Sequence, residues 1–298
     1  MTDNIRMDLC KDYDEMVQAW MQERGIQTDK CGFELWYEFF NLQKKSVPVQ
    51  KRKVLFSKEF TCPSNLELGM KRLAEKLEHG QDVSLYLSKD SVAASEFDSL
   101  LYDWGIYHFH LGEKIDNRTG RIERTGPLLF AKIDAQKVYC INVYTHGKGN
   151  RPWSKQEMIR ILHQNWPETI QRYRIPGEVH LCPDTISPPT DSEYADLRKN
   201  GVSTIIFVED GVAYFSPGGG YTASGHSCEI ITHIQRVNNA LKMAELRIKE
   251  NIASIAAHIG NSTGQPSNKS FHFKLVGIES VFYVAELQSK QLIVEVKF

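Results

Sequence analysis

The sequence predicts an α+β fold in which a small antiparallel sheet packs on helices, with a helical N-terminal extension and a second α+β domain. Three observations predict it. Apolar residues recur at helical spacing early in the chain, short runs rich in β-branched and aromatic residues follow, and a cluster of prolines precedes a last set of strands. With 298 residues, 41% apolar and 24% charged, the chain is long enough for two domains.

Residues 1–60 form the expected N-terminal extension. Their apolar residues lie at helical spacing and indicate amphipathic helices that must pack on another part of the chain. These residues are Tyr13, Met16, Val17, Trp20, Phe33, Leu35, Trp36, Phe39, Phe40 and Leu42. A basic connector around Pro48 marks the expected boundary, although a short strand at 54–60 could already belong to the next domain.

Residues 61–175 form the expected central domain. Its helices are expected at 66–79, 95–101 and 154–166, and its strands at 106–111, 128–133 and 138–145. Gly80 closes the first helix, while Ser154 as N-cap with Glu157 would form a capping box at the last. The link 134–137 is short enough for a hairpin. The longer link between the first two strands is an exposed basic loop that carries Arg118, Arg121 and Arg124.

A Pro-rich linker at 176–190 precedes the expected C-terminal α+β domain at 191–298. In that domain we expect a hairpin at 204–215, a long helix at 227–258 and strands at 271–287 and 291–296. The helix is apolar and long for one small domain, which favours a homo-oligomer formed through it. The glycine-rich stretch 216–225 lacks a phosphate-binding signature and is interpreted as a flexible loop.

Charge is distributed unevenly along the chain. Residues 113–174 hold twelve Lys/Arg against six Asp/Glu, a local +6 that leaves −7 elsewhere in a chain of net charge −1. A polyanion would meet this region first, although a basic surface without a ligand is equally compatible with it. The six cysteines form no CxxC pair, and no apolar run could span a membrane, so we expect reduced thiols in a cytoplasmic protein with no membrane partner.

Two of the expected strands carry histidines in phase. Alternation places His108 and His110 on one strand face, and Asn142, Tyr144 and His146 on one face of another, opposite Tyr139, Ile141 and Val143. If both strands share a sheet, its polar face carries three imidazoles and a phenol. That combination suits proton transfer better than it suits a core, because histidine changes charge near neutral pH.

The order helix, strand, basic loop, strand, tight turn, strand, basic segment and helix over residues 66–166 resembles the RelE/ParE-like toxin superfamily. The residues that carry the resemblance are 104–111, 128–133 and 138–146, followed by Lys148, Arg151, Trp153 and the closing helix. The resemblance implies a RelE-like α+β domain and an mRNA-cleaving endoribonuclease associated with the ribosome, of toxin or phage-defence type. It places His146, Lys148 and Arg151 in the active-site region, with Arg124 entering from the loop.

Metal-free RNA cleavage requires a base, an acid and cations that stabilise the phosphorane. His146 is expected as base or acid, His110 or His108 as its complement, Arg124 or Arg151 as charge stabiliser, and Tyr144 as a substitute acid. Arg118, Arg121, Lys148 and Trp153 are expected to bind RNA, with Trp153 stacking on a base. A hydrolase of this kind would need no cofactor, and neither a cofactor nor a metal is expected.

Two other classes of function stay open. His108, His110, Glu113 and His146 could ligate a metal. Alternatively, the chain could be a non-enzymatic adaptor or regulator, whose basic sheet binds nucleic acid or an acidic protein while the C-terminal domain assembles subunits, and a regulatory protein partner is then expected. The adaptor hypothesis explains the length of the chain better than a single toxin domain does.

Overall fold

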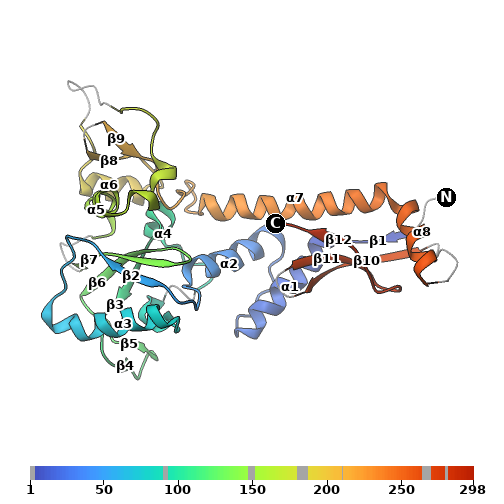
Figure 1. The fold of residues 1–298 in the computed structure, drawn as a ribbon, viewed down its shortest axis with the longest axis horizontal. Coiled ribbons are helices and arrows are strands. Elements are labelled where there is room, and N and C mark those ends of the chain that lie inside the picture. The colour runs from blue at the N-terminus through green and yellow to red at the C-terminus, as the bar shows by residue number, and fades with distance from the viewer. Residues whose placement is uncertain are drawn as a thin grey trace. The chain divides into compact units, whose positions relative to one another are not determined.

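The computed structural model describes residues 4–89, 93–146, 152–179, 187–209, 211–263, 270–278 and 281–298, and it confirms the α+β class (Figure 1). The chain forms two compact units. The central unit comprises residues 41–229, and the terminal unit combines residues 1–40 with 230–298. These boundaries differ from the four expected segments, because the N-terminal residues join the C-terminal strands in one unit and the Pro-rich linker lies inside the other.

The terminal unit is built around a four-stranded sheet of order β1-β10-β11-β12. Its strands are β1 (Asn4–Arg6), β10 (Ser270–Ile278), β11 (Val281–Glu286) and β12 (Gln291–Val296). Its helices are α1 (Leu9–Glu23), the first part of α2 (Gly32–Lys45), most of α7 (Cys228–Glu250) and α8 (Ile252–Thr263). β1 pairs in parallel with β10, which joins the two ends of the chain.

Two expected elements of this unit are each divided in the structure. The expected helix 227–258 is α7 and α8, which meet at Asn251, and the expected strand 271–287 is the antiparallel pair β10 and β11. The amphipathic pattern of α1 is confirmed, because Leu9, Tyr13, Val17 and Met21 are all buried. Among the described residues, no helix is long and apolar enough to cross a membrane.

The central unit contains a second four-stranded sheet, of order β2-β7-β6-β3. Its strands are β2 (Lys53–Phe56), β7 (Lys137–Thr145), β6 (Pro127–Ile133) and β3 (Ile106–His110). The three expected strands are therefore confirmed, and the hairpin between β6 and β7 is closed by Asp134, whose Oδ1 accepts both the Gln136 and the Lys137 N–H at 2.7 Å. β2 pairs in parallel with β7, so residues 53–56 belong to this sheet.

Helices cover both faces of this sheet. One face packs on α3 (Glu67–His79), and the other packs on α4 (Ser99–Trp104), α5 (Glu157–Asn165), α6 (Asp191–Lys199) and the hairpin of β8 (Ile206–Glu209) and β9 (Val212–Tyr214). Figure 1 shows α3 on one side of the sheet and α5 and α6 on the other. A two-stranded ribbon of β4 (Ile115–Asp116) and β5 (Arg121–Ile122) lies within the basic loop.

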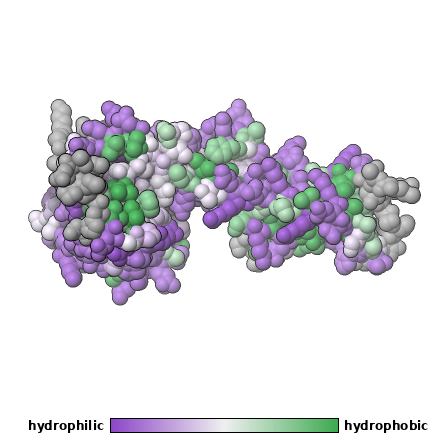
Figure 2. Space-filling model, turned by 90° about the horizontal axis from the view of Figure 1, so that it is seen from above, coloured by the Kyte–Doolittle hydropathy of each residue, from purple (hydrophilic) through white to green (hydrophobic). Residues whose placement is uncertain are grey.

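Single turns of 3₁₀ helix connect several of these elements. They span Ser64–Leu66, Ser84–Tyr86, Pro152–Ser154, Pro167–Thr169 and Gln171–Tyr173. Polar residues cover most of the surface seen in Figure 2, with scattered apolar patches between them.

The alternation expected along β7 is wrong, because the pairing of β7 with β6 contains a β-bulge. The register shifts where Phe130 pairs with Asn142 and the next residue of β6 pairs with Cys140. A bulge inserts one extra residue, so the side chains beyond it change faces. Ile141 consequently packs in the same core as Tyr144, while Val143 packs on the α3 side.

The N-terminus of α5 also differs from the expectation. Ser154 is buried in the turn Pro152–Ser154, and α5 begins at Glu157 without a side-chain cap. Gln156, at the N-cap position, instead donates from Nε2 to the Pro189 carbonyl at 2.7 Å. A capping box does occur at α6, between Thr190 and Glu193.

Candidate functional site

A pocket of about 360 Å³ opens in the central unit, at the end of the sheet where β3 and β7 finish. Five residues that the sequence analysis selected line it, namely His108, His110, Arg124, His146 and Trp153. The other lining residues are Lys45, Leu87, Ser88, Phe97, Asp98, Ser99, Leu100, Tyr107 and Leu128. The structure therefore brings all three in-phase histidines and one loop arginine to a single cavity.

The strand register explains why the histidines meet. His108 pairs with Phe130 of β6, and His110 pairs with Leu128, which pairs in turn with Tyr144 of β7. His146 follows β7 and continues the ladder, because its N–H donates to the Gly126 carbonyl at 3.0 Å. Since alternate residues share a face, His110 and His146 reach the same end of the sheet face as His108.

His110 is a neutral hydrogen-bond donor at this site. The residue is 6% exposed, and its Nδ1 accepts the Thr125 N–H at 3.2 Å. Burial, and then the nearby His108, Arg124 and His146, lower the pKa of His110 to about 4. With Nδ1 acting as acceptor, the proton of the neutral ring is assigned to Nε2. At neutral pH His110 can therefore donate to an anion, but it cannot serve as a cationic general acid.

His108 lies between a carboxylate and an aromatic ring. Its Nδ1 is 4.0 Å from Oδ2 of Asp98, and its ring centroid is 4.8 Å from that of Trp153 in an edge-to-face arrangement. Asp98 is fixed by its role at the start of α4, where Oδ1 accepts the Leu101 N–H at 2.9 Å. The 4.0 Å separation is too long for a hydrogen bond, so the carboxylate acts on His108 as a nearby negative charge that stabilises the ring when it is protonated.

Arg124 supplies positive charge at the pocket. It is exposed in the segment that follows β5, and within the described ranges no carboxylate pairs with its guanidinium. A guanidinium can bind two oxygens of a phosphate or carboxylate at once. Arg124 is therefore positioned to bind an anionic ligand.

The end of α2 holds residues 93–98, and Phe97 and Asp98 of this segment line the pocket. Lys45 is buried, and its Nζ donates to the carbonyls of Ala93 and Glu96. Asn41 donates to Ala94 and Glu96 carbonyls at 2.8 and 3.0 Å. These bonds fix the segment that carries Phe97 and Asp98 to the pocket. Sequence reasoning missed Lys45, Phe97 and Asp98, because no local pattern connects them to the histidine strands.

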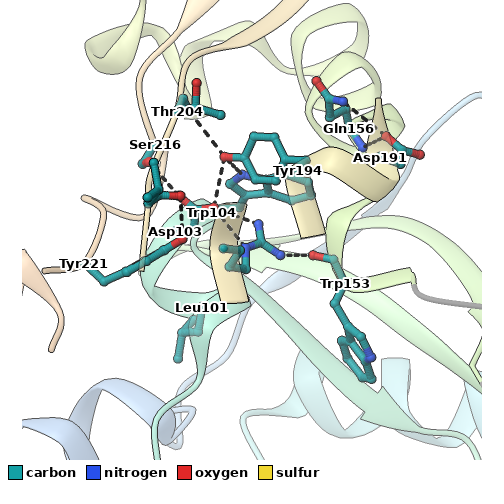
Figure 3. A network of polar contacts seen from close by, with 12 residues as sticks. Leu101, Asp103, Trp104, Trp153, Gln156, Asp191, Tyr194, Thr204, Ser216 and Tyr221 are labelled. Carbon is teal, nitrogen blue, oxygen red and sulfur yellow. Dashed lines mark hydrogen bonds and ion pairs between the residues drawn. The ribbon is translucent and has the colours of Figure 1, made fainter. Parts of the chain in front are cut away.

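A buried polar network holds the backbone at Trp153 in place (Figure 3). Arg198 donates to the Trp153 carbonyl and forms an ion pair with Asp103 at 2.7 Å. Asp103 also accepts the hydroxyls of Tyr194 at 3.0 Å and Ser216 at 2.5 Å. Both oxygens of the buried Asp103 carboxylate accept hydrogen bonds. The network therefore fixes the backbone at Trp153, whose side chain lines the pocket.

Three other predicted catalytic or RNA-binding residues lie elsewhere or outside the description. Tyr144 does not line the pocket, since its hydroxyl donates to Oε2 of Glu157 at 3.1 Å. Burial raises the pKa of the Tyr144 phenol, which makes it a poorer acid. Lys148 and Arg151 lie outside the described residues.

The two remaining arginines of the basic loop have different environments. Arg118 has a side chain that is 91% exposed, 3.6 Å from Asp116 in the β4–β5 turn. Arg121 donates to the carbonyls of Ser84 and Leu87 at 2.9 and 3.1 Å. Arg118 is thus available on the surface, whereas Arg121 holds the loop against residues 84–87.

No metal-ligand group is found among the described residues. Glu113, a candidate ligand in the alternative metal hypothesis, does not line the pocket, and its carbonyl accepts from Arg72 at 2.9 Å. The Nδ1 atom of His110 is already engaged by Thr125. The imidazoles and the guanidinium that line the pocket can take part in acid–base chemistry and can bind an anion.

The glycine-rich segment serves close packing. The Gly218 N–H donates to the Asp103 carbonyl at 2.7 Å. A Cβ at position 218 would lie 2.4 Å from the Gly105 nitrogen and 2.5 Å from the Leu101 carbonyl oxygen. Glycine is therefore required there for the loop to approach α4.

Comparison with known protein families, curated proteins and solved structures found no match.

Proposed function

We propose that the central unit is an RNA-directed endoribonuclease that uses metal-free acid–base chemistry. The observation that carries the proposal is the convergence of His108, His110, His146 and Arg124 on one pocket. The excess of basic residues over 113–174 and the resemblance to RelE/ParE-like toxins support it. Translating mRNA is the proposed substrate, and a toxin or phage-defence role is the proposed context.

The reaction would be an internal transesterification of RNA. The 2′-oxygen attacks the adjacent phosphorus while a base removes its proton, and the bond from phosphorus to the 5′-oxygen breaks as an acid protonates that oxygen. His146 and His108 are the proposed base and acid pair, and the Asp98 carboxylate, 4.0 Å from His108 Nδ1, would stabilise the protonated form of His108. The N–H of His110 and the Arg124 guanidinium would stabilise the charge on the phosphorane.

The experiment that tests this function is incubation of the full chain with total RNA, with and without ribosomes and EDTA. We expect cleavage that persists in EDTA and falls roughly 10²- to 10⁴-fold in His146→Ala, the usual effect of losing a general acid or base. His79→Ala is the matched control, because His79 is an exposed histidine at the end of α3. Absence of cleavage in every condition would count decisively against the proposal.

A binding-only adaptor is the second candidate, and the exposed Arg118 in the basic loop favours it. In that case the chain would retain RNA affinity in His146→Ala. Reversing Arg118 and Arg124 to glutamate would abolish binding, because phosphate contacts dominate affinity for nucleic acid. Salt-dependent binding without cleavage by the wild-type chain would identify this candidate as the correct one.

A further inference from the structure

The pocket combines cationic and aromatic groups in a way that indicates more than a phosphate site. Phe97 is 49% exposed, although it lies at a cavity and within reach of other rings. Its centroid is 6.4 Å from that of Tyr102 and 5.3 Å from that of His226, both edge-to-face. A Cβ at Gly225 would lie 3.4 Å from the Phe97 ring, an ordinary van der Waals distance, so Gly225 is also a neighbour of the ring.

These contacts hold Phe97 in place while leaving half of it uncovered. An ordered, exposed aromatic ring beside a cationic pocket is the usual platform for stacking a nucleic-acid base. The segment that carries Phe97 is held by the buried Lys45 and Asn41, so the ring need not be ordered when a ligand binds.

The other side of the pocket provides groups for a phosphate. Arg124 and the N–H of His110 are donors, and neither offers an acceptor to a competing cation. Arg124, one of the groups that lower the pKa of His110, carries a positive charge that an anion would neutralise. The volume of about 360 Å³ lies toward the small end of ligand pockets, so it suits one small ligand.

We infer that the pocket receives one unpaired nucleotide, with its base stacked on Phe97 and its phosphate at Arg124 and His110. This inference rests on the proposed RNA-cleaving function and specifies its substrate as single-stranded RNA. A base inside a duplex is stacked and paired, so it could reach Phe97 only after leaving the helix. Duplex RNA is therefore excluded from the pocket.

Calorimetric titration of the full chain with 3′-AMP and with adenosine tests the two halves of the pocket separately. Phe97→Leu is expected to weaken binding of both probes by roughly 5- to 100-fold, the range found when a stacking aromatic is removed. Arg124→Gln is expected to weaken only 3′-AMP, by roughly 10- to 100-fold, because it removes a charged hydrogen bond. Phe215→Leu is the matched control, since Phe215 is 56% exposed and does not line the pocket.

Competition with RNA completes the experiment. A single-stranded oligonucleotide is expected to displace 3′-AMP, whereas the same strand in a duplex is not. The inference is overturned if 3′-AMP does not bind, if Phe97→Leu binds like the wild-type chain, or if duplex RNA competes equally. Any of these results together with retained RNA cleavage overturns the inference alone, whereas binding as described without cleavage of any RNA overturns only the proposed function.

Discussion

Replacing His110 by asparagine should remove a pH-dependent loss of stability from the central unit. His110 is buried, and its pKa is lowered from 6.5 to about 4, first by burial and then by the neighbouring His108, Arg124 and His146. The Oδ1 atom of asparagine can accept the Thr125 N–H in place of Nδ1, but it does not titrate. The variant therefore keeps the hydrogen bond and loses the titration.

The magnitude follows from proton linkage. Between pH 6.5 and 4 the unfolded chain binds a proton at this histidine and the folded chain does not, so the free energy of unfolding falls as the pH falls. Each pKa unit corresponds to 1.36 kcal/mol, and a shift of about 2.5 units gives a loss of about 3 kcal/mol at pH 4. Above pH 6.5 the contribution does not change with pH.

The assay is urea-induced unfolding at several pH values from 7.5 to 4, followed by tryptophan fluorescence. Three of the five tryptophans, Trp104, Trp153 and Trp166, lie in the central unit. The quantity to compare is the difference in unfolding free energy between wild type and His110→Asn, because titrating groups that do not interact with His110 cancel in it. A difference that stays constant between pH 6.5 and 4 would refute the reasoning about the burial of His110.

Three further substitutions test the surroundings of the pocket. Arg198→Met should lower the unfolding free energy by about 3–5 kcal/mol in urea denaturation, because it leaves the buried Asp103 carboxylate without its cation; a loss under about 1 kcal/mol would contradict this. Tyr144→Phe should lower the unfolding free energy by about 1 kcal/mol, because the hydrogen bond to Glu157 is lost, and should leave RNA cleavage unchanged. An inactive variant would show that the Tyr144 hydroxyl takes part in the reaction. Gly218→Ala should cost about 1–3 kcal/mol in the same denaturation assay, since the added methyl group overlaps backbone atoms; wild-type stability would show that the loop can move aside.

The histidine pair on β3 could be predicted because the strand is regular. β3 is an edge strand that pairs with β6 without a register shift, so alternation in the sequence matches alternation in the structure. The same reasoning failed along β7, where the bulge near Ile141 moves residues between faces. Nothing in the local sequence marks that bulge, because no glycine or proline accompanies it.

Long-range pairing limited the prediction of domains and of the remaining pocket residues. β1 and β10 pair through Asn4 and Ser270, and periodicity within a short window carries no information about such a contact. Similarly, Lys45 reaches the pocket by binding the carbonyls of residues 93 and 96, which depends on how α2 packs. Phe97 and Asp98 become site residues only through that packing.

A double-mutant cycle on RNA cleavage tests most directly whether these residues form one catalytic site. The measurement is the single-turnover rate on a single-stranded RNA oligonucleotide for wild type, His146→Ala, Arg124→Ala and the double variant. Residues that act on the same phosphate should be strongly non-additive, so we expect each single variant to lose roughly 100-fold or more and the double variant to lose much less than the product. Unchanged rates in the single variants, or strictly multiplicative losses, would contradict a shared site.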